Sequence, residues 1–127
     1  MIDPIYAVSL KILADEIREL AVEVLEDQPP QFVLRGVRTM PTPGWKLCVD
    51  RVDKDIDASG MRLGAYLTDI PPKGIVPQVL SPTEVRIPLG PLPLGRHLVS
   101  IFSRREEEAT YRLLHALVVE AERPSAT

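Results

Sequence analysis

The 127-residue chain has one cysteine, Cys48, one tryptophan, Trp45, and no asparagine. A single cysteine excludes an intrachain disulfide, a dithiol redox motif and a cysteine-rich zinc knuckle. The chain is therefore expected to need neither an oxidising compartment nor a thiol-bound metal.

Long apolar runs and basic runs are also missing. No run of about eighteen apolar residues occurs, so we expect no membrane-spanning helix. The first twenty residues carry acids where a secretory signal needs a basic start. The net charge of −3, with scattered Lys and Arg, gives no support to a nucleic-acid partner. We expect a cytoplasmic protein, or one held in a protein assembly such as a virion, without a signal peptide.

The absence of asparagine is accompanied by thirteen prolines and an excess of Arg over Lys. Few thermolabile residues and proline-stiffened loops are typical of thermophilic proteins, so we hypothesise a thermophilic source. A GC-rich genome, which favours Arg, Pro and Ala codons, explains the same composition. A melting temperature below about 65 °C would contradict the thermophilic source.

Residues 3–27 are predicted to form one long amphipathic helix, so that residues 1–28 make an N-terminal arm. Asp3 is a suitable N-cap, Pro4 suits the first helical position, and Pro29 ends the segment. Apolar residues recur at heptad spacing, as the interface of a coiled coil requires: Tyr6, Leu10, Leu13, Ile17, Leu20 and Val24.

Three uses of this helix remain open. It could pack on its own domain, or it could associate with a second copy or another protein through the heptad residues. Binding to a membrane surface is disfavoured because the polar face is acidic.

Beyond the double proline the apolar period changes to two, which indicates half-buried strands over residues 31–121. Turn sequences such as DASG and PPKG separate the strands. We predict an antiparallel, immunoglobulin-like β-sandwich of six to seven strands, followed by a tail at 122–127. The candidate strands are QFVLRGVRTM, GWKLCVDRV, MRLGAYLTDI, TEVRIPL, RHLVSIFSRRE and TYRLLHALVVE.

The last of these segments is ambiguous. Apolar residues between 106 and 121 fall on helical spacing, and the acids at 106–108 suit the first turn of a helix. Two alternating segments around a charged turn equally predict a hairpin. We prefer the hairpin and leave the helix open.

The segment TMPTPGWKLCV predicts a rigid turn that opens a strand. Alternation sends Trp45, Leu47 and Val49 to one face, which we expect to be the core, and Cys48 to the other. Pro41, Pro43 and Trp45 are the candidate contact loop for another chain.

TPGWKLCVDRV and PPKGIVPQVLSPTEVRIP resemble the small β domain of bacterial protease-stability accessory proteins, the PrcB-like family. The likeness covers residues 36–89: a Gly-aromatic pair opens a strand that ends in Val, and a Pro-x-Gly loop leads to a Gln-Val-Leu-Ser-Pro strand. The resemblance implies an immunoglobulin-like sandwich that binds or supports other proteins, and it carries over no catalytic residue. The family is usually exported, and Gly44 stands where some relatives carry a cysteine.

Catalytic and metal-binding patterns are poorly matched. Asp53, Asp55 and Asp57 alternate, but Ala58 and Gly64 occupy positions where a calcium loop needs Gly and Glu. His97 and His115 lie outside any metal-ligand spacing, and no G-x-S-x-G elbow or phosphate-binding loop occurs. We therefore expect no enzyme, no metal and no cofactor.

Two functions fit these observations best. The first is a non-enzymatic structural protein that assembles with itself or with a partner protein through its N-terminal helix, as a virion component, assembly scaffold or accessory subunit. The alternative is a soluble module that binds a small ligand or peptide through Trp45 and the proline-rich loops. A hydrolase with an unusual active site is the least favoured reading.

Overall fold

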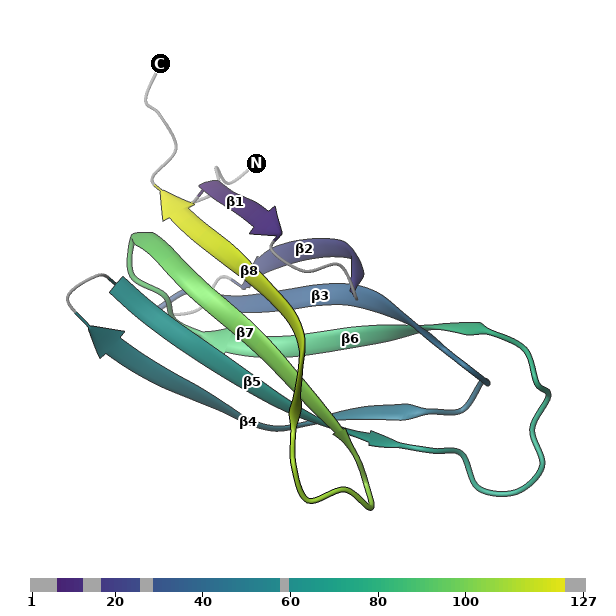
Figure 1. Ribbon diagram of the computed structural model, residues 1–127. Helices are drawn as coiled ribbons and strands as arrows, with labels where there is room; N and C mark the ends of the chain where they lie inside the picture. Colours follow the sequence, from purple (N-terminus) through teal and green to yellow (C-terminus); the bar gives the residue numbers. More distant parts are fainter. Residues whose placement is uncertain (1–6, 13–16, 26–28, 58–59, 123–127) are drawn as a thin grey trace.

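The computed structural model describes residues 7–12, 17–25, 29–57 and 60–122, which form eight strands and no helix. The strands are β1 (Ala7–Ile12), β2 (Arg18–Leu25), β3 (Gln31–Met40), β4 (Lys46–Asp57), β5 (Gly60–Ile70), β6 (Ser81–Gly90), β7 (Gly95–Arg105) and β8 (Arg112–Glu122). They form two sheets in a sandwich-like arrangement (Figure 1). The predicted β-sandwich is thus confirmed at this level.

The larger sheet has the order β1-β8-β7-β5-β4 and the smaller sheet the order β2-β3-β6. Neighbouring strands are antiparallel except β5 and β7, which run parallel. The chain leaves β5 for β6 in the smaller sheet and returns as β7, and the two reversals restore the original direction. The prediction of a wholly antiparallel sandwich is wrong at this pair.

The core lies between the sheets and is built by alternation along the strands. In β5, Met61, Leu63, Ala65 and Leu67 are buried, whereas the residues between them face away from the core. Strands β6, β7 and β8 repeat the pattern with Val85, Ile87, Leu89, Val99, Ile101, Leu117 and Val119. All six strands predicted between residues 31 and 121 are confirmed, and the helical alternative for residues 106–121 is wrong.

The long N-terminal helix is wrong for the described residues, because β1 and β2 occupy residues 7–12 and 18–25. Leu20, Val22 and Val24 pack against the core at a period of two. The apolar residues of the segment LAVEVL, 20–25, include both helical and strand spacings, and the β-branched valines suit a pleated sheet. Pairing of β2 with β3 then selects the strand.

Because β1 and β2 belong to the two sheets, the sandwich domain begins before residue 31. The sandwich was expected to begin at residue 31, but β1 is an edge of the larger sheet and β2 an edge of the smaller one. Glu122 ends β8, and the remainder of the predicted tail, 123–127, lies outside the described residues.

A buried ion pair joins the sheets at one end of the core. Arg38 of β3 donates two hydrogen bonds to Asp69 of β5, with N–O distances of 2.8 and 3.0 Å. The side chains are 11% and 8% exposed. The carbonyl oxygen of Asp69 also accepts a hydrogen bond of 3.2 Å from the backbone N–H of Glu106. This end of the sandwich carries the turn between β7 and β8 and the loops described next.

Candidate functional site

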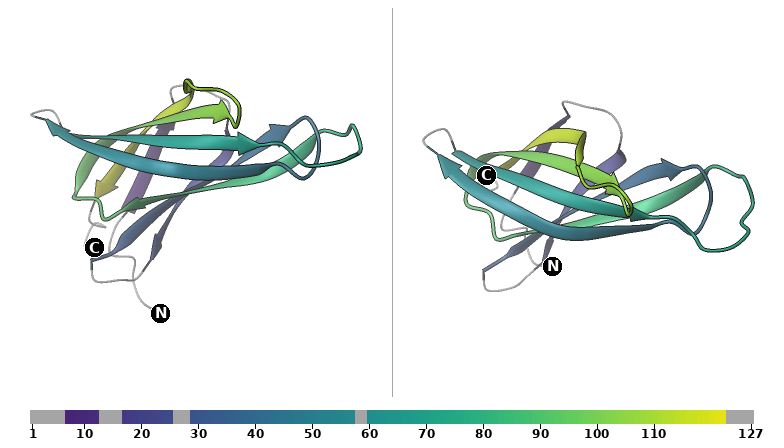
Figure 2. Two further views of the ribbon diagram at one scale, coloured as in Figure 1. Left: turned by 90° about the horizontal axis from the view of Figure 1, so that it is seen from below. Right: turned by 60° about the horizontal axis from the view of Figure 1, so that its bottom comes forward.

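Residues 71–80, which we call the projecting loop, connect β5 to β6 without forming a strand or helix. Figure 1 shows this loop extending well beyond both sheets, and the views of Figure 2 agree. Ile75 is 103% exposed, Leu80 70% and Val79 59%. Three large apolar side chains are thus presented to solvent on one segment.

Proline restricts the projecting loop. Pro71, Pro72 and Pro77 fix their own φ angles and lack an N–H donor, so these positions are biased towards extended backbone. The hydroxyl of Ser81 donates a hydrogen bond of 3.1 Å to the carbonyl oxygen of Val79 at the start of β6. The apolar side chains are consequently held on a stiffened backbone.

The base of the projecting loop contacts residues 41–45, which we call the corner. Gly44 has φ +88°, and a Cβ added there would lie 2.9 Å from Cβ of Pro72. Two features therefore require glycine at this position: its backbone angle and the close approach of the loop.

Trp45 closes the corner instead of entering the core. Its indole Nε1 donates a hydrogen bond of 3.0 Å to Oγ1 of Thr42, and the guanidinium of Arg105 lies 5.9 Å from its ring centroid. Leu47 and Val49 do pack against the core, as expected, and Cys48 on the other face is half-buried. The predicted burial of Trp45 in the core is thus wrong, because the tryptophan lies at the end of the sandwich.

The predicted contact loop is placed beside the projecting loop. Pro41 is exposed, while Pro43 and Trp45 are half-buried. Contact of these residues with another chain stays a prediction.

A second feature lies on the outer face of the larger sheet, the face turned away from the core. Tyr66, Phe102 and Tyr111, which we call the aromatic cluster, meet there. Tyr66 stacks on Phe102 at a centroid distance of 5.0 Å, and Tyr111 meets Tyr66 edge-on at 5.0 Å. The parallel register of β5 and β7 places Tyr66 opposite Phe102.

Two arginines border the aromatic cluster. The guanidinium of Arg51 lies 4.0 Å from the Tyr66 centroid, and that of Arg104 lies 4.8 Å from the Tyr111 centroid. These distances fall within the range of cation–π attraction. A bulge in β4 after Val49 turns Arg51 towards this face.

The same bulge leaves Asp50 without a register partner and directs it to the hydroxyls beside the cluster. Tyr111 donates a hydrogen bond of 2.6 Å to Oδ2 of Asp50, and Thr68 donates another to the same oxygen. The hydrogen bonds from Thr68 and Tyr111 hold the pKa of Asp50 below its ordinary value, and Arg104 and Arg51 lower this pKa further. A carboxylate with a lowered pKa is a poor general base, so this network favours fixing the rings over proton transfer.

The aromatic cluster was not predicted from the sequence. Its members come from β5, from β7 and from the residue before β8, and two bulges, at Asp50 and Leu114, set which side chains face outward. The outward alternation of Tyr66 in β5 and Phe102 in β7 was the available signal, but it does not reveal that the two strands are neighbours.

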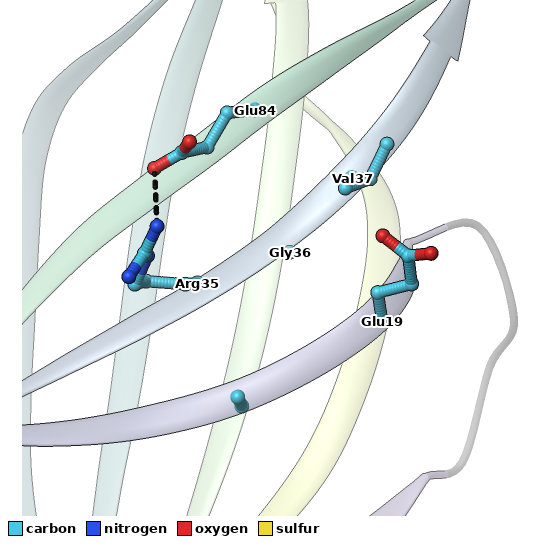
Figure 3. Close-up of a pocket in the computed structure, with 6 residues that line it drawn as sticks. Glu19, Arg35, Gly36, Val37 and Glu84 are labelled. Atoms are coloured by element: carbon cyan, nitrogen blue, oxygen red, sulfur yellow. Dashed lines mark hydrogen bonds and ion pairs between the residues drawn. The ribbon is translucent and has the colours of Figure 1, made fainter.

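Figure 3 shows a shallow pocket on the outer face of the smaller sheet, with a volume of about 300 Å³. Arg35 in its wall donates to Glu84 at 3.3 Å and to Glu23 at 3.5 Å. Gly36 in its floor leaves space for Ile17, since a Cβ there would collide with Cγ2 of Ile17. Arg35 and Glu84 in the pocket are thus paired within the sheet, and Gly36 makes room for a core side chain.

The predicted heptad residues do not form one helical face. Tyr6 and Leu13 lie outside the described residues, and Leu10 lies in β1, in register with Val119. Ile17 is 1% exposed, while Leu20 and Val24 contact the core from β2. Contact of these residues with a partner stays a prediction, but it would not use a coiled coil in the described strands.

Both histidines and one of the three aspartates weighed as metal ligands have other contacts. His97 shares a hydrogen bond of 2.7 Å with the carbonyl oxygen of Pro93, and the backbone N–H of Ile17 donates to Nδ1 of His115. Asp53 accepts a hydrogen bond of 3.1 Å from Arg51. Within the part of the chain that the structure describes, no three His, Cys, Asp or Glu residues are grouped to hold a metal ion.

No family model, curated protein or solved structure matches this chain significantly. The resemblance to the PrcB-like domain therefore stays a prediction. Over the same described residues there is no helix long and apolar enough to span a membrane.

Proposed function

We propose that this chain is a non-enzymatic assembly protein whose copies associate through the projecting loop. The observation that carries the proposal is the exposure of Ile75, Val79 and Leu80 on this loop. Burying one such side chain is favourable by about 1.5–3 kcal/mol, so the exposure of all three on one segment indicates a surface that another chain covers.

Stiffness supports the proposal as well. A flexible loop would lose conformational entropy when it docks, whereas prolines and a braced base reduce this loss. Gly44 and Pro72 provide the brace, and Trp45 with Thr42 fixes the corner below it. We propose that Pro41, Pro43 and Trp45 act as the support and margin of the contact surface.

The chemistry on the outer face favours a binding role over catalysis. Asp50 has a lowered pKa and accepts hydrogen bonds from two hydroxyls, which orients Tyr111 and Thr68 without activating a nucleophile. A virion component, an assembly scaffold and an accessory subunit all require such an adhesive module. We also propose that the sandwich uses loops at one end for contact, as immunoglobulin-like domains do, an inference by analogy of fold.

The mass of the protein in solution tests this function. We expect light scattering after size-exclusion chromatography to give a mass above the 14.1 kDa of one chain, rising with concentration. The triple variant Ile75→Ser, Val79→Ser, Leu80→Ser should elute as a monomer, because serine removes the apolar contact and leaves the prolines in place.

The matched control changes exposed apolar residues outside the loop. Ile56→Ser, Leu94→Ser alters side chains that are 73% and 46% exposed, and it should leave the mass unchanged. A wild-type mass of one chain at every concentration, or the same oligomer in the triple variant, would contradict the proposal.

A further inference from the structure

We infer that the projecting loop of one copy lies on the aromatic cluster of a second copy. This inference rests on the proposed self-association and names the surface that receives the loop. The partner is thus a second copy of this chain, which carries both halves of the contact.

The loop and the cluster have matching surfaces. Extended, proline-rich segments dock on aromatic-lined surfaces, where rigid rings meet proline and aliphatic side chains at little entropic cost. The cluster continues into Leu113, which lies opposite Phe102 in the register of β7 and β8 and is 59% exposed. Ile75, Val79 and Leu80 therefore have an apolar and aromatic counterpart on the same molecule.

Arg51 and Arg104 border the cluster, and beyond them one side of it offers charges opposite to that of the loop. Lys73 is the charged residue of the projecting loop, which contains no acid. Glu106, Glu107 and Glu108 form an acidic turn beside the cluster, where the carbonyl oxygen of Glu108 accepts a hydrogen bond of 3.3 Å from Arg104. A loop seated on the cluster would bring Lys73 towards this turn and favour the pairing electrostatically.

The position of both surfaces favours a reciprocal contact. The loop starts directly after β5, whose Tyr66 and Thr68 contribute to the cluster and its polar border, and the acidic turn joins β7 to β8 at the same end (Figure 1). When two complementary surfaces share one end of a molecule, two copies can exchange them about a two-fold axis, which closes the assembly at a dimer.

Site-directed disulfide formation tests the contact. In a Cys48→Ser background, protein carrying Ile75→Cys is mixed with protein carrying Leu113→Cys under mild oxidation. We expect a mixed disulfide between the two chains. Ile56→Cys replaces Leu113→Cys in the control, because Ile56 is similarly exposed but lies on β4 away from the cluster. The control should link at least about tenfold less, in line with a specific interface.

The outcomes separate this inference from the proposed function. Suppose that the wild-type chain is an oligomer and the triple serine variant a monomer, but Ile75→Cys links to Leu113→Cys no better than to Ile56→Cys. The loop then contacts another surface of the second copy. The inference is then wrong and the proposed function stands. Linkage only between two Ile75→Cys chains would place loop against loop and would also overturn it. A strictly monomeric wild-type chain would contradict both the inference and the proposed function.

Charge reversal gives a second readout of the same contact. Lys73→Glu should weaken association about two- to fivefold, as expected for an exposed ion pair. Adding Glu106→Lys and Glu107→Lys to the same chain should restore the affinity, because each copy then carries both reversed charges. Failure of the combined variant to recover any affinity would place Lys73 away from the acidic turn.

Discussion

Arg38 and Asp69 form an ion pair between the two sheets, and replacing either residue leaves the charge of the other without its partner. Each is about nine-tenths buried, and two hydrogen bonds join their side chains. Charges withdrawn from water in this way depend on their partner for compensation. The pair therefore fixes the relative position of β3 and β5 at the end that bears the projecting loop.

Asp69→Asn should lower the free energy of unfolding by about 3–5 kcal/mol, because it leaves the Arg38 guanidinium buried without its counter-charge. Urea denaturation measures this change. The double variant Arg38→Met, Asp69→Leu should recover a large part of the loss. Arg35→Met is the exposed control at the Glu84 ion pair, and it should change stability by no more than about 1 kcal/mol. Equal losses at the buried and exposed pairs would contradict the account.

Asp50 should make stability depend on pH in acid. Its folded-state pKa is lowered by hydrogen bonds from Thr68 and Tyr111 and by the nearby arginines, whereas the ordinary pKa of this group is 3.8. The contribution is therefore fully present above pH 3.8 and is lost as pH falls through the lowered pKa. Asp50→Asn should flatten the decline of the unfolding free energy in this range.

Carbon-13 NMR titration of the Asp50 carboxyl checks the cause. Tyr111→Phe removes one donor and should raise the pKa of Asp50. Tyr66→Phe removes a hydroxyl outside this hydrogen-bond network and should leave the pKa of Asp50 unchanged. An Asp50 pKa at its ordinary value in the wild-type protein would refute the network.

At the scale of elements, the sequence predicts those strands whose formation depends on local patterns. The strands from residue 31 onward follow from alternation and from turns rich in proline and glycine. Residues 7–25 contain leucine and valine at both helical and strand spacing, and the decision comes from β8 and β3, which a local window does not contain. The aromatic cluster escaped prediction for the same reason, because the parallel pairing of β5 with β7 is a property of the whole topology.

The corner and the projecting loop offer a matched pair of glycines. Gly44 and Gly74 have similar positive φ angles, +88° and +84°, but only Gly44 would bring a Cβ within 4 Å of another residue, Pro72. Alanine at either position should cost about 1–2 kcal/mol for the backbone angle. Gly44→Ala should cost about 1–3 kcal/mol more for the collision with Pro72.

Thermal or urea unfolding of the two variants measures the difference. If Gly44→Ala and Gly74→Ala are equally stable, the corner does not brace the loop. In a self-associating protein, the Gly44→Ala variant should also show weaker association, because the base of the loop has shifted.

At the scale of the whole molecule, one end of the sandwich carries the corner, the projecting loop and the acidic turn. The outer face of the smaller sheet bears Arg35 in ion pairs with Glu23 and Glu84, which suits contact with water. A net charge of −3 is small enough that copies repel each other weakly. The proposed assembly uses the end with the projecting loop and leaves the charged face of the smaller sheet in water.

The most direct test of the account is the dissociation constant of the assembly by sedimentation equilibrium, for wild type, Ile75→Ser and Ile56→Ser. Losing one buried isoleucine should weaken association about ten- to a hundredfold in Ile75→Ser. Ile56→Ser should match the wild type, although Ile56 is also well exposed. Equal dissociation constants for Ile75→Ser and wild type would contradict the claim that the projecting loop joins the copies.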